Sequence, residues 1–275
     1  MHLFSFIPVY IVLYFLGTSI SAAASPPKVV SLNVCTDQFL MLLADDNQIV
    51  SLSEISTNIF SSAMATEAAK YNQNSSGAEE VYLLQPDIVL AGIYTAKATV
   101  NMLESLGIRV EKFEPAYTVE QIIINIQRVG ELLEHTDRAD TLVANFESRL
   151  AKLTKGIKAR PRAALYHANG YTTGKNTLAG QILDLAGFSN IASEIDIHWG
   201  GILPLELLIM SKPDVIITGT TYPGSSRSEE ILKHPAIKHL RHVSSTDANW
   251  VCGTPHILRA IEDLQTIHPD KMSTK

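Results

Sequence analysis

The feature of this chain that most constrains its fold is a helix-to-strand unit that occurs twice. In residues 79–90, EEVYLLQPDIVL, a glutamate lies seven positions before a Pro-Asp pair that opens an all-aliphatic strand. Residues 206–217, ELLIMSKPDVII, repeat this spacing, and Pro213 lies 127 positions after Pro86. An all-aliphatic strand is typical of a parallel sheet that is buried on both faces. The repetition therefore predicts two related α/β lobes.

Strands and helices alternate on both sides of one long helical segment. Short apolar strands are predicted at residues 28–33, 88–91 and 109–113, and the alternation restarts after Pro161. A helix from residue 136 to about residue 158 would be about 33 Å long. Its charged surface is compatible with a rigid strut between lobes and with an ordinary surface helix, and the residues alone do not separate the two.

The N-terminus has the features of an export signal. Residues 3–16 are almost wholly apolar, and Ala22-Ala23-Ala24 fits the small-residue rule for signal peptidase, which predicts a signal peptide over residues 1–24. The alternative is a short membrane anchor, although the apolar run is below the roughly 18 residues that span a bilayer. The residue directly after the predicted cleavage point is not a cysteine, so we expect a periplasmic protein without a lipid anchor.

Composition excludes several classes of protein. The hydrophobic fraction of 46% argues against disorder, and two cysteines are too few for a disulfide framework. The net charge of −6 includes no basic excess, so we expect no nucleic-acid partner. No GxSxG or HExxH motif is present, so hydrolysis has no support and we do not expect an enzyme.

With these motifs in order, the chain resembles the periplasmic substrate-binding proteins of bacterial ABC importers, in the branch that carries cobalamin, ferric siderophores or haem. The matching pieces are KVVSLNVCTDQFLMLLAD, EEVYLLQPDIVLAG, the helix from residue 137 to 158, LAGQILDLAGFSNIA, LPLELLIMSKPDVIITG and NWVCGTPHILRAIEDL. The resemblance implies an α/β fold of two Rossmann-like lobes joined by a single long α-helix, with the ligand cleft between the lobes. The expected division is an N-terminal lobe at 25–135, the connecting helix at 136–159 and a C-terminal lobe at 160–275.

The resemblance also implies a function and a partner. We expect a monomer that captures an iron-siderophore or a corrinoid such as cobalamin and delivers it to an ABC importer, with no cofactor of its own. Glu79 and Glu206 match the positions at which one glutamate on each lobe docks onto arginines of the importer's membrane subunits, and Glu80 is the alternative in the first lobe. The plainer interpretation is that a glutamate in a first helical turn only suits the helix dipole.

Candidate ligand-binding residues follow the predicted strands, because α/β sheets bind ligands at the carboxyl ends of their strands. Several are aromatic with a polar group, which suits a large and partly apolar chelate. The candidates are Asn33, Cys35, Thr36, Asp37, Tyr94 and Tyr117 in the first lobe, and His167, Asn169, Tyr171, Trp199, Tyr222 and Trp250 in the second.

Metal ligation and cysteine pairing stay open at this point. Tyr94, Tyr171, His167 or His198 could ligate haem iron, although ordinary structural roles are the simpler interpretation for the histidines. No resident metal site is predicted, because the spacing of His234, His239 and His242 matches no zinc motif. Cys35 and Cys252 could form a disulfide across the cleft or line it as free thiols, and we favour free thiols because a cross-cleft bond would obstruct ligand exchange.

Three alternatives to a corrinoid or siderophore carrier differ in the residues they would need. A haem-binding protein, or a protein for a bare Zn or Mn ion, would share the architecture, and the bare ion would need three or four converging His, Asp or Glu ligands. An enzyme on a two-lobed scaffold, such as a nitrogenase-like metallocluster protein, would need more cysteines than the two present.

Overall fold

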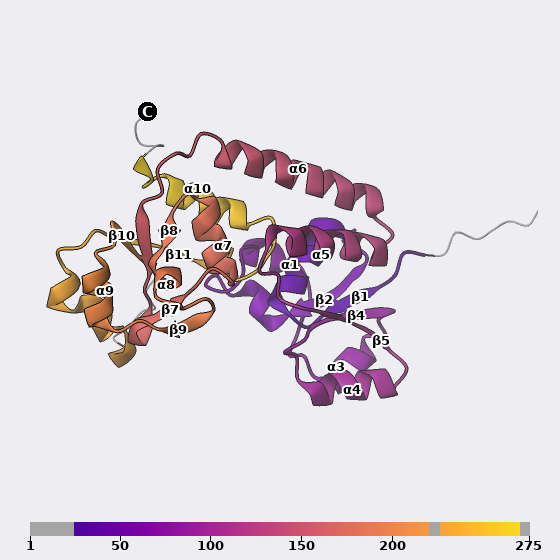
Figure 1. The fold of residues 1–275 in the computed structure, drawn as a ribbon. Helices are drawn as coiled ribbons and strands as arrows, with labels where there is room; N and C mark the ends of the chain where they lie inside the picture. The colour runs from indigo at the N-terminus through magenta and orange to yellow at the C-terminus, as the bar shows by residue number, and fades with distance from the viewer. Residues whose placement is uncertain (1–24, 220–225, 270–275) are drawn as a thin grey trace, which may run out of the picture.

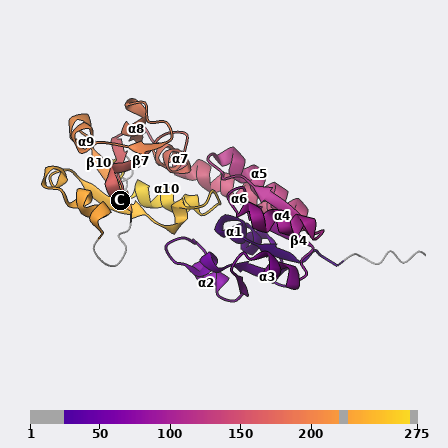
Figure 2. The same cartoon turned by 90° about the horizontal axis from the view of Figure 1, so that it is seen from below.

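The structure is a computed structural model that describes residues 25–219 and 226–269. The predicted signal peptide and the candidate Tyr222 lie outside the described residues. Figure 1 shows two α/β lobes with helix α6 running along one side of both. Figure 2, seen from below, shows the two lobes side by side.

The N-terminal lobe is built on a parallel sheet with strand order β3-β2-β1-β4-β5. Its elements are β1 (Val29–Ser31), α1 (Val34–Leu43), β2 (Ile49–Ser53), η1 (Glu54–Thr57), α2 (Ala65–Ala68), β3 (Gln73–Asn74), α3 (Ala78–Leu83), β4 (Ile88–Gly92), α4 (Lys97–Ser105), β5 (Arg109–Phe113) and α5 (Val119–Leu132).

The connecting helix α6 (Thr136–Thr154) leads into the C-terminal lobe, whose parallel sheet has the order β11-β10-β6-β8 beside a two-stranded antiparallel pair, β7-β9. Its elements are β6 (Arg162–Leu165), η2 (Ala168–Gly170), β7 (Tyr171–Thr173), α7 (Leu178–Leu185), β8 (Ser189–Asn190), α8 (Ile191–Glu194), β9 (Gly200–Ile202), α9 (Leu205–Ser211), β10 (Val215–Gly219), η3 (Arg227–Lys233), η4 (Pro235–Ile237), β11 (His242–Thr246), η5 (Ala248–Trp250) and α10 (Ile257–Gln265).

The Pro-Asp pair of each repeat ties together the same two strands in each lobe. The Asp87 carboxylate accepts a hydrogen bond from the Lys28 backbone N–H (2.7 Å), and the Asp87 N–H donates to the Lys28 carbonyl (2.8 Å). Asp214 makes the same two bonds with Arg162, also at 2.7 and 2.8 Å. Each aspartate therefore sets the start of β4 or β10 against its neighbour, β1 or β6, which accounts for the repeated motif.

Local sequence signals explain where several helices begin and end. Thr118 and Gln121 form a capping box at the start of α5, and the Thr177 hydroxyl caps α7. Gly107 and Gly187 follow α4 and α7 with φ of 80° and 94°, a conformation that glycine adopts without strain.

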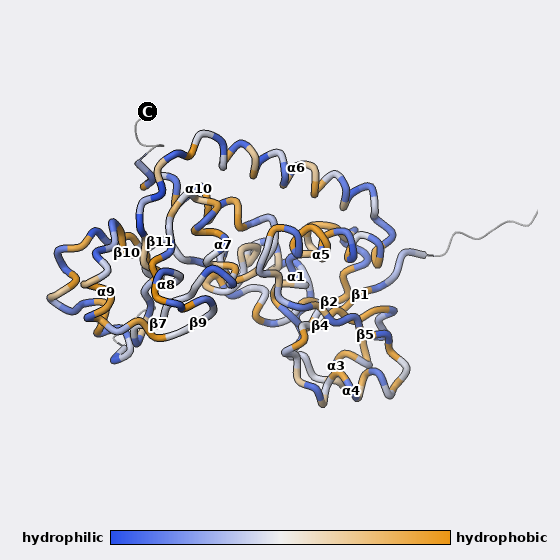
Figure 3. The backbone as a smooth tube through the Cα atoms, in the orientation of Figure 1, coloured by the Kyte–Doolittle hydropathy of each residue, from blue (hydrophilic) through white to orange (hydrophobic). Residues whose placement is uncertain are grey.

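Helix α6 is held by both lobes. Arg138 near its start donates to the Leu43 carbonyl and pairs with Asp45 (2.7 Å) in the N-terminal lobe. Arg149 near its end pairs with Glu262 of α10 (2.8 Å) in the C-terminal lobe. Its surface alternates between hydrophilic and hydrophobic positions (Figure 3), and Phe146 is among its buried residues. These contacts fit the strut and not a helix that covers one lobe alone.

The helix is shorter than predicted. It ends at Thr154, so its 19 residues span about 28 Å and not the 33 Å expected. Gly156, with φ of 79°, lies two residues after the last residue of the helix. One apolar cluster runs from Leu40 and Ile126 through Phe146 to Ile261. The two lobes therefore share a continuous core on the α6 side.

Candidate functional site

Two adjoining cavities lie where the lobes face each other. The larger, of about 540 Å³, has residues of the C-terminal lobe along most of its lining, and the smaller, of about 150 Å³, is lined mainly by the N-terminal lobe. Both are lined by Trp250 and Val251, so the cavities meet at these residues and form one cleft. The strands of each sheet end toward this cleft, as expected for an α/β ligand site.

Five of the six candidates from the N-terminal lobe line the smaller cavity: Asn33, Cys35, Thr36, Tyr94 and Tyr117. Asn33 also caps helix α1, since its side-chain oxygen accepts from the Cys35 N–H (2.9 Å). The Thr36 hydroxyl is buried and bonded to Ser31 (2.7 Å). Asn33 and Thr36 therefore shape the wall, while the exposed Tyr94 and the half-buried Tyr117 offer their rings to a ligand.

Three candidates from the C-terminal lobe line the larger cavity: His167, Tyr171 and Trp250. The Trp250 indole N–H donates to the Ser245 carbonyl (3.0 Å), which fixes the ring plane at the junction of the two cavities. Burial lowers the pKa of His167, so its imidazole is neutral at pH 7 and has a lone pair available. Asn169 and His198 are not among the lining residues.

An aromatic contact crosses the cleft beside the smaller cavity. The rings of Tyr117 in the N-terminal lobe and Trp199 in the C-terminal lobe pack edge to face, with centroids 5.5 Å apart. Burial and the neighbouring Tyr94 raise the pKa of Tyr117, so its phenol is neutral. Trp199 lines neither cavity, but its contact with Tyr117 places it beside the smaller one. Both of the chain's two tryptophans therefore lie at the cleft.

Asp37 is not part of the cleft lining. Its carboxylate is fully buried inside the N-terminal lobe, where it accepts hydrogen bonds from the Ser53 hydroxyl and the Ser53 N–H (3.1 Å). Burial raises its pKa from 3.8 to about 7, against the opposing effect of these hydrogen bonds. The prediction that Asp37 follows a strand is correct. Its side chain, however, points from helix α1 toward Ser53 of β2, so it does not line the cleft.

Replacing Asp37 with asparagine should flatten the pH dependence of stability. The folded-state pKa of about 7 lies above the ordinary 3.8, so the native state keeps a proton that the unfolded chain releases in this interval. Stability from this group is complete below about pH 4 and falls as the pH rises to 7, by about 4 kcal/mol. Urea denaturation at pH 5 and 8 measures the part of this change above pH 5, about 2.7 kcal/mol. Burial lowers the pKa of His256 to about 4, which adds an opposite pH dependence to every variant, so the difference between variants is the test. Between these pH values Asp37→Asn should lose about 2.7 kcal/mol less stability than wild type and than Asp140→Asn, a control on the exposed side of α6. An equal pH dependence in all three would refute the assignment.

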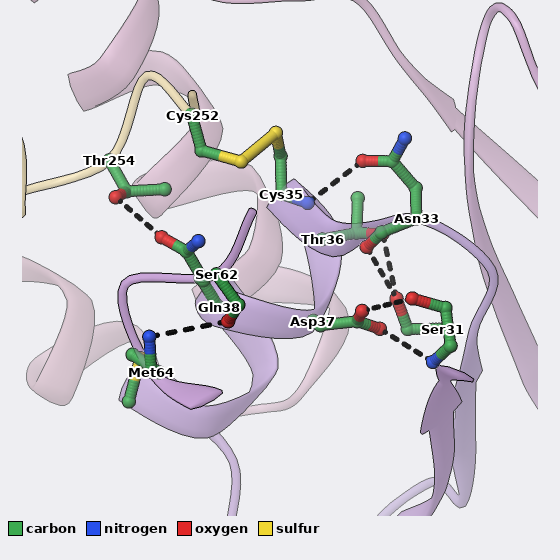
Figure 4. The surroundings of a disulfide bond; sticks show 11 residues. Ser31, Asn33, Cys35, Thr36, Asp37, Gln38, Ser62, Met64, Cys252 and Thr254 are labelled. Carbon is green, nitrogen blue, oxygen red and sulfur yellow. Dashed lines mark hydrogen bonds between the residues drawn. A yellow bond between two sulfur atoms is a disulfide. The ribbon is translucent and has the colours of Figure 1, made fainter. Parts of the chain in front are cut away.

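The two cysteines are joined, which corrects the expectation of free thiols. Cys35 and Cys252 form a disulfide with Cα atoms 5.2 Å apart (Figure 4). The segment after Trp250 crosses to the N-terminal lobe, where the Thr254 hydroxyl donates to the buried Gln38 side chain (3.0 Å) and Gly253 lies against Ala116. The bond therefore ties this crossing segment to the first turn of α1, and its Cys35 end lies in the wall of the smaller cavity.

Sequence reasoning missed part of the lining. Glu114 and Asp247 directly follow β5 and β11, so the rule used for the other candidates would have found both. Glu229 also lines the larger cavity, and it follows no predicted strand. Ile59 and Phe60 reach the larger cavity from the N-terminal lobe, and no motif distinguishes their loop in the sequence.

The two predicted docking glutamates lie apart from the cleft. Glu79 is in the first turn of α3 and Glu206 in the first turn of α9, and both are exposed. Glu80 is occupied locally, because its carboxylate accepts from the Ser75 N–H (2.9 Å) and hydroxyl (2.7 Å). Of the two neighbouring acids, Glu79 is therefore the one directed to solvent.

Two features are missing from the described part of the chain. Across residues 25–219 and 226–269, no three His, Cys, Asp or Glu side chains are grouped so that they could hold a metal ion. Within the same ranges no helix has the length and apolar character needed to span a bilayer.

Curated relatives match most of the chain. A cobalamin-binding protein of Halobacterium salinarum is 29% identical over 210 residues, which are 74% of this chain and 57% of that protein. The chain thus spans just over half the length of the halobacterial relative. A vitamin B12-binding protein of Photorhabdus laumondii is 24% identical over 263 residues and 92% of both chains.

Solved structures share the fold. The periplasmic haem-binding protein HutB of Vibrio cholerae superposes with a TM-score of 0.74 at 17% identity, covering 88% of this chain and 98% of its own. The vitamin B12-binding protein BtuF of the same organism gives 0.65 at 17% identity, covering 91% and 98%. The family model for periplasmic binding proteins matches residues 29–246. Because this match covers most of the chain, the chain belongs to the periplasmic binding protein family.

Proposed function

We propose that this protein captures a corrinoid or a ferric siderophore in the cleft between its lobes and delivers it to an ABC importer. The observation that supports this most is the aromatic lining from both lobes, with Tyr94 and Tyr117 on one side and Tyr171 and Trp250 on the other. Flat aromatic surfaces with polar edges suit a large metal chelate that has apolar faces and a polar rim. The cobalamin-binding relatives favour the corrinoid.

The role is binding and not catalysis. The cleft combines one neutral imidazole with aromatic rings, and this set can hold a chelate without a nucleophile-base pair to act on it. The location follows from the family, whose members are exported to the periplasm. Residues 1–24 serve as the signal peptide in this proposal, and the protein acts as a monomer without a lipid anchor.

Docking to the importer would use Glu79 and Glu206. Each exposed carboxylate has a strongly exposed apolar residue four positions later, one helical turn away on the same face: Leu83 is 71% exposed and Met210 is 73% exposed. Large apolar side chains gathered at the surface mark interaction sites. The same charge-and-apolar pair on both lobes fits a partner that presents two equivalent surfaces, as a pair of membrane subunits would.

A fluorescence titration tests ligand capture. The protein is titrated with cyanocobalamin, ferrichrome, ferric enterobactin and haemin, with absorbance corrections for these coloured ligands. We expect saturable 1:1 quenching by a corrinoid or siderophore at sub-micromolar concentration, because both tryptophans lie at the cleft. Binding of haemin alone would replace the proposal with haem carriage, and silence across the panel would refute capture of a metal chelate.

A further inference from the structure

The charged residues in the described lining of the cleft are all acidic, and nothing in the family assignment requires this. Glu229 and Asp247 line the larger cavity and Glu114 lines the smaller one. Among the described residues that line either cavity, none is Lys or Arg. The six residues that follow the lining residue Gly219, TTYPGS, contain no charged side chain in the sequence. The described lining of the two cavities therefore presents three carboxylates and no permanent cation.

Several basic side chains of the two lobes form ion pairs with carboxylates that do not line the cleft. In the N-terminal lobe, Arg128 pairs with Glu111, and Lys112 pairs with Glu104 (2.8 Å). Arg162 pairs with Glu194 behind the C-terminal sheet. None of these basic residues lines either cavity, and the charged side chains of the described lining are carboxylates.

A ligand that carries carboxylates or catecholates would meet this surface unfavourably. Its negative groups would lose water on entering the cleft and would find acidic neighbours without a guanidinium or ammonium to pair with. A neutral chelate avoids this cost, and a cationic one gains attraction. The aromatic rings of the lining can contact the apolar faces of a chelate whatever its net charge. The carboxylates are therefore the groups that can discriminate between chelates by charge.

We propose that Glu114, Glu229 and Asp247 make the cleft selective for a metal chelate that is neutral or positively charged, and that they exclude anionic chelates. This inference rests on the proposed function, because it concerns the ligand held in the same cleft. Discrimination of this kind is negative selection: like charges placed in the site act against the wrong ligand without new contacts to the right one.

Two pairs of probes that differ in charge and little else test the proposal. Cyanocobalamin is neutral, and its side-chain monocarboxylic acid carries one negative charge on the same corrin. Ferrioxamine B has a terminal ammonium group, and its N-succinyl derivative has a terminal carboxylate on the same iron hydroxamate. Dissociation constants from fluorescence titration should favour the neutral or cationic member of each pair that binds by about tenfold or more.

Charge-removing variants then locate the effect. Glu229→Gln with Asp247→Asn, and separately Glu114→Gln, should narrow the ratio of the two dissociation constants within a pair, chiefly by tightening the binding of the anionic member. The amide oxygen introduced by Asp247→Asn can still accept the Asn249 N–H, so the local cap is preserved. Glu230→Gln is the matched control, because Glu230 is exposed beside Glu229 and lines neither cavity.

The outcomes separate the two proposals. Equal or tighter binding of the anionic member, in a pair that binds, would overturn charge selection and leave the proposed function standing. An unchanged ratio in all the variants would show that these three carboxylates are not the cause, and would also overturn the inference. If no probe of either charge binds, the proposed capture of a metal chelate fails, and the inference fails with it.

Discussion

Replacing Glu79 and Glu206 together with alanine should abolish delivery of ligand to the importer. Each carboxylate can make a bidentate, charge-assisted pair with an arginine, and such a hydrogen bond is worth about 1.5–3 kcal/mol. Loss of both should weaken docking by about 100-fold or more. Uptake into proteoliposomes that contain the cognate importer measures the effect. Ligand affinity should be unchanged, because neither glutamate lines the cleft.

Matched controls separate docking from a general loss of negative charge. Glu120→Ala with Glu147→Ala removes two exposed glutamates, from α5 and α6, and should transport at the wild-type rate. Glu80→Ala should also transport normally, since that carboxylate is engaged with Ser75. Normal uptake by the Glu79 and Glu206 double variant would exclude these residues as the docking pair, whatever the controls do.

Replacing Cys35 and Cys252 together with serine should cause a large loss of stability. The disulfide links residues 217 positions apart, so it removes much of the freedom of the unfolded chain. For a loop of this length the chain-entropy relation gives an expected loss in the free energy of unfolding of about 5 kcal/mol. Urea denaturation with and without reductant measures it, and reduced wild type should unfold at the same denaturant concentration as the variant.

The variant itself provides the control for that comparison. Reductant should leave its unfolding midpoint unchanged, because the described residues contain no other cysteine and the sequence has only these two. If wild type unfolds at the same midpoint with and without reductant, the bond contributes nothing to stability. The serine side chains that replace the two cysteines are small and polar, so the Thr254–Gln38 hydrogen bond beside them should persist in the variant.

The architecture was predictable because its signals are local or repeated. The aspartate of each Pro-Asp motif, Asp87 or Asp214, makes the same hydrogen bonds to the neighbouring strand in both lobes. A glycine just after a helix is a local end signal, and Gly107 and Gly187 follow α4 and α7 with positive φ values. The end of α6 was placed too late because its charged periodicity continues past Thr154, whereas the chain leaves the helix just before Gly156.

The site was predicted less completely, for physical reasons. Position after a strand identified His167, Tyr171 and Tyr117, but it does not specify the direction of a side chain, so Asp37 was chosen although it lies in the core. The disulfide was judged as a barrier across the cleft, because the sequence does not show that residues 252–254 cross to α1. Ile59 reaches the cavity only through tertiary placement of its loop.

The central claim is that one ligand is held by both lobes at once, and the titration tests it most directly when it is repeated on one variant from each lobe. With the chelate that binds wild type, Tyr117→Ala in the N-terminal lobe and Tyr171→Ala in the C-terminal lobe should each raise the dissociation constant by about tenfold or more. Tyr82→Ala, a control at an exposed position of α3, should bind as wild type does. Wild-type affinity in both lobe variants would contradict capture of the ligand between the lobes.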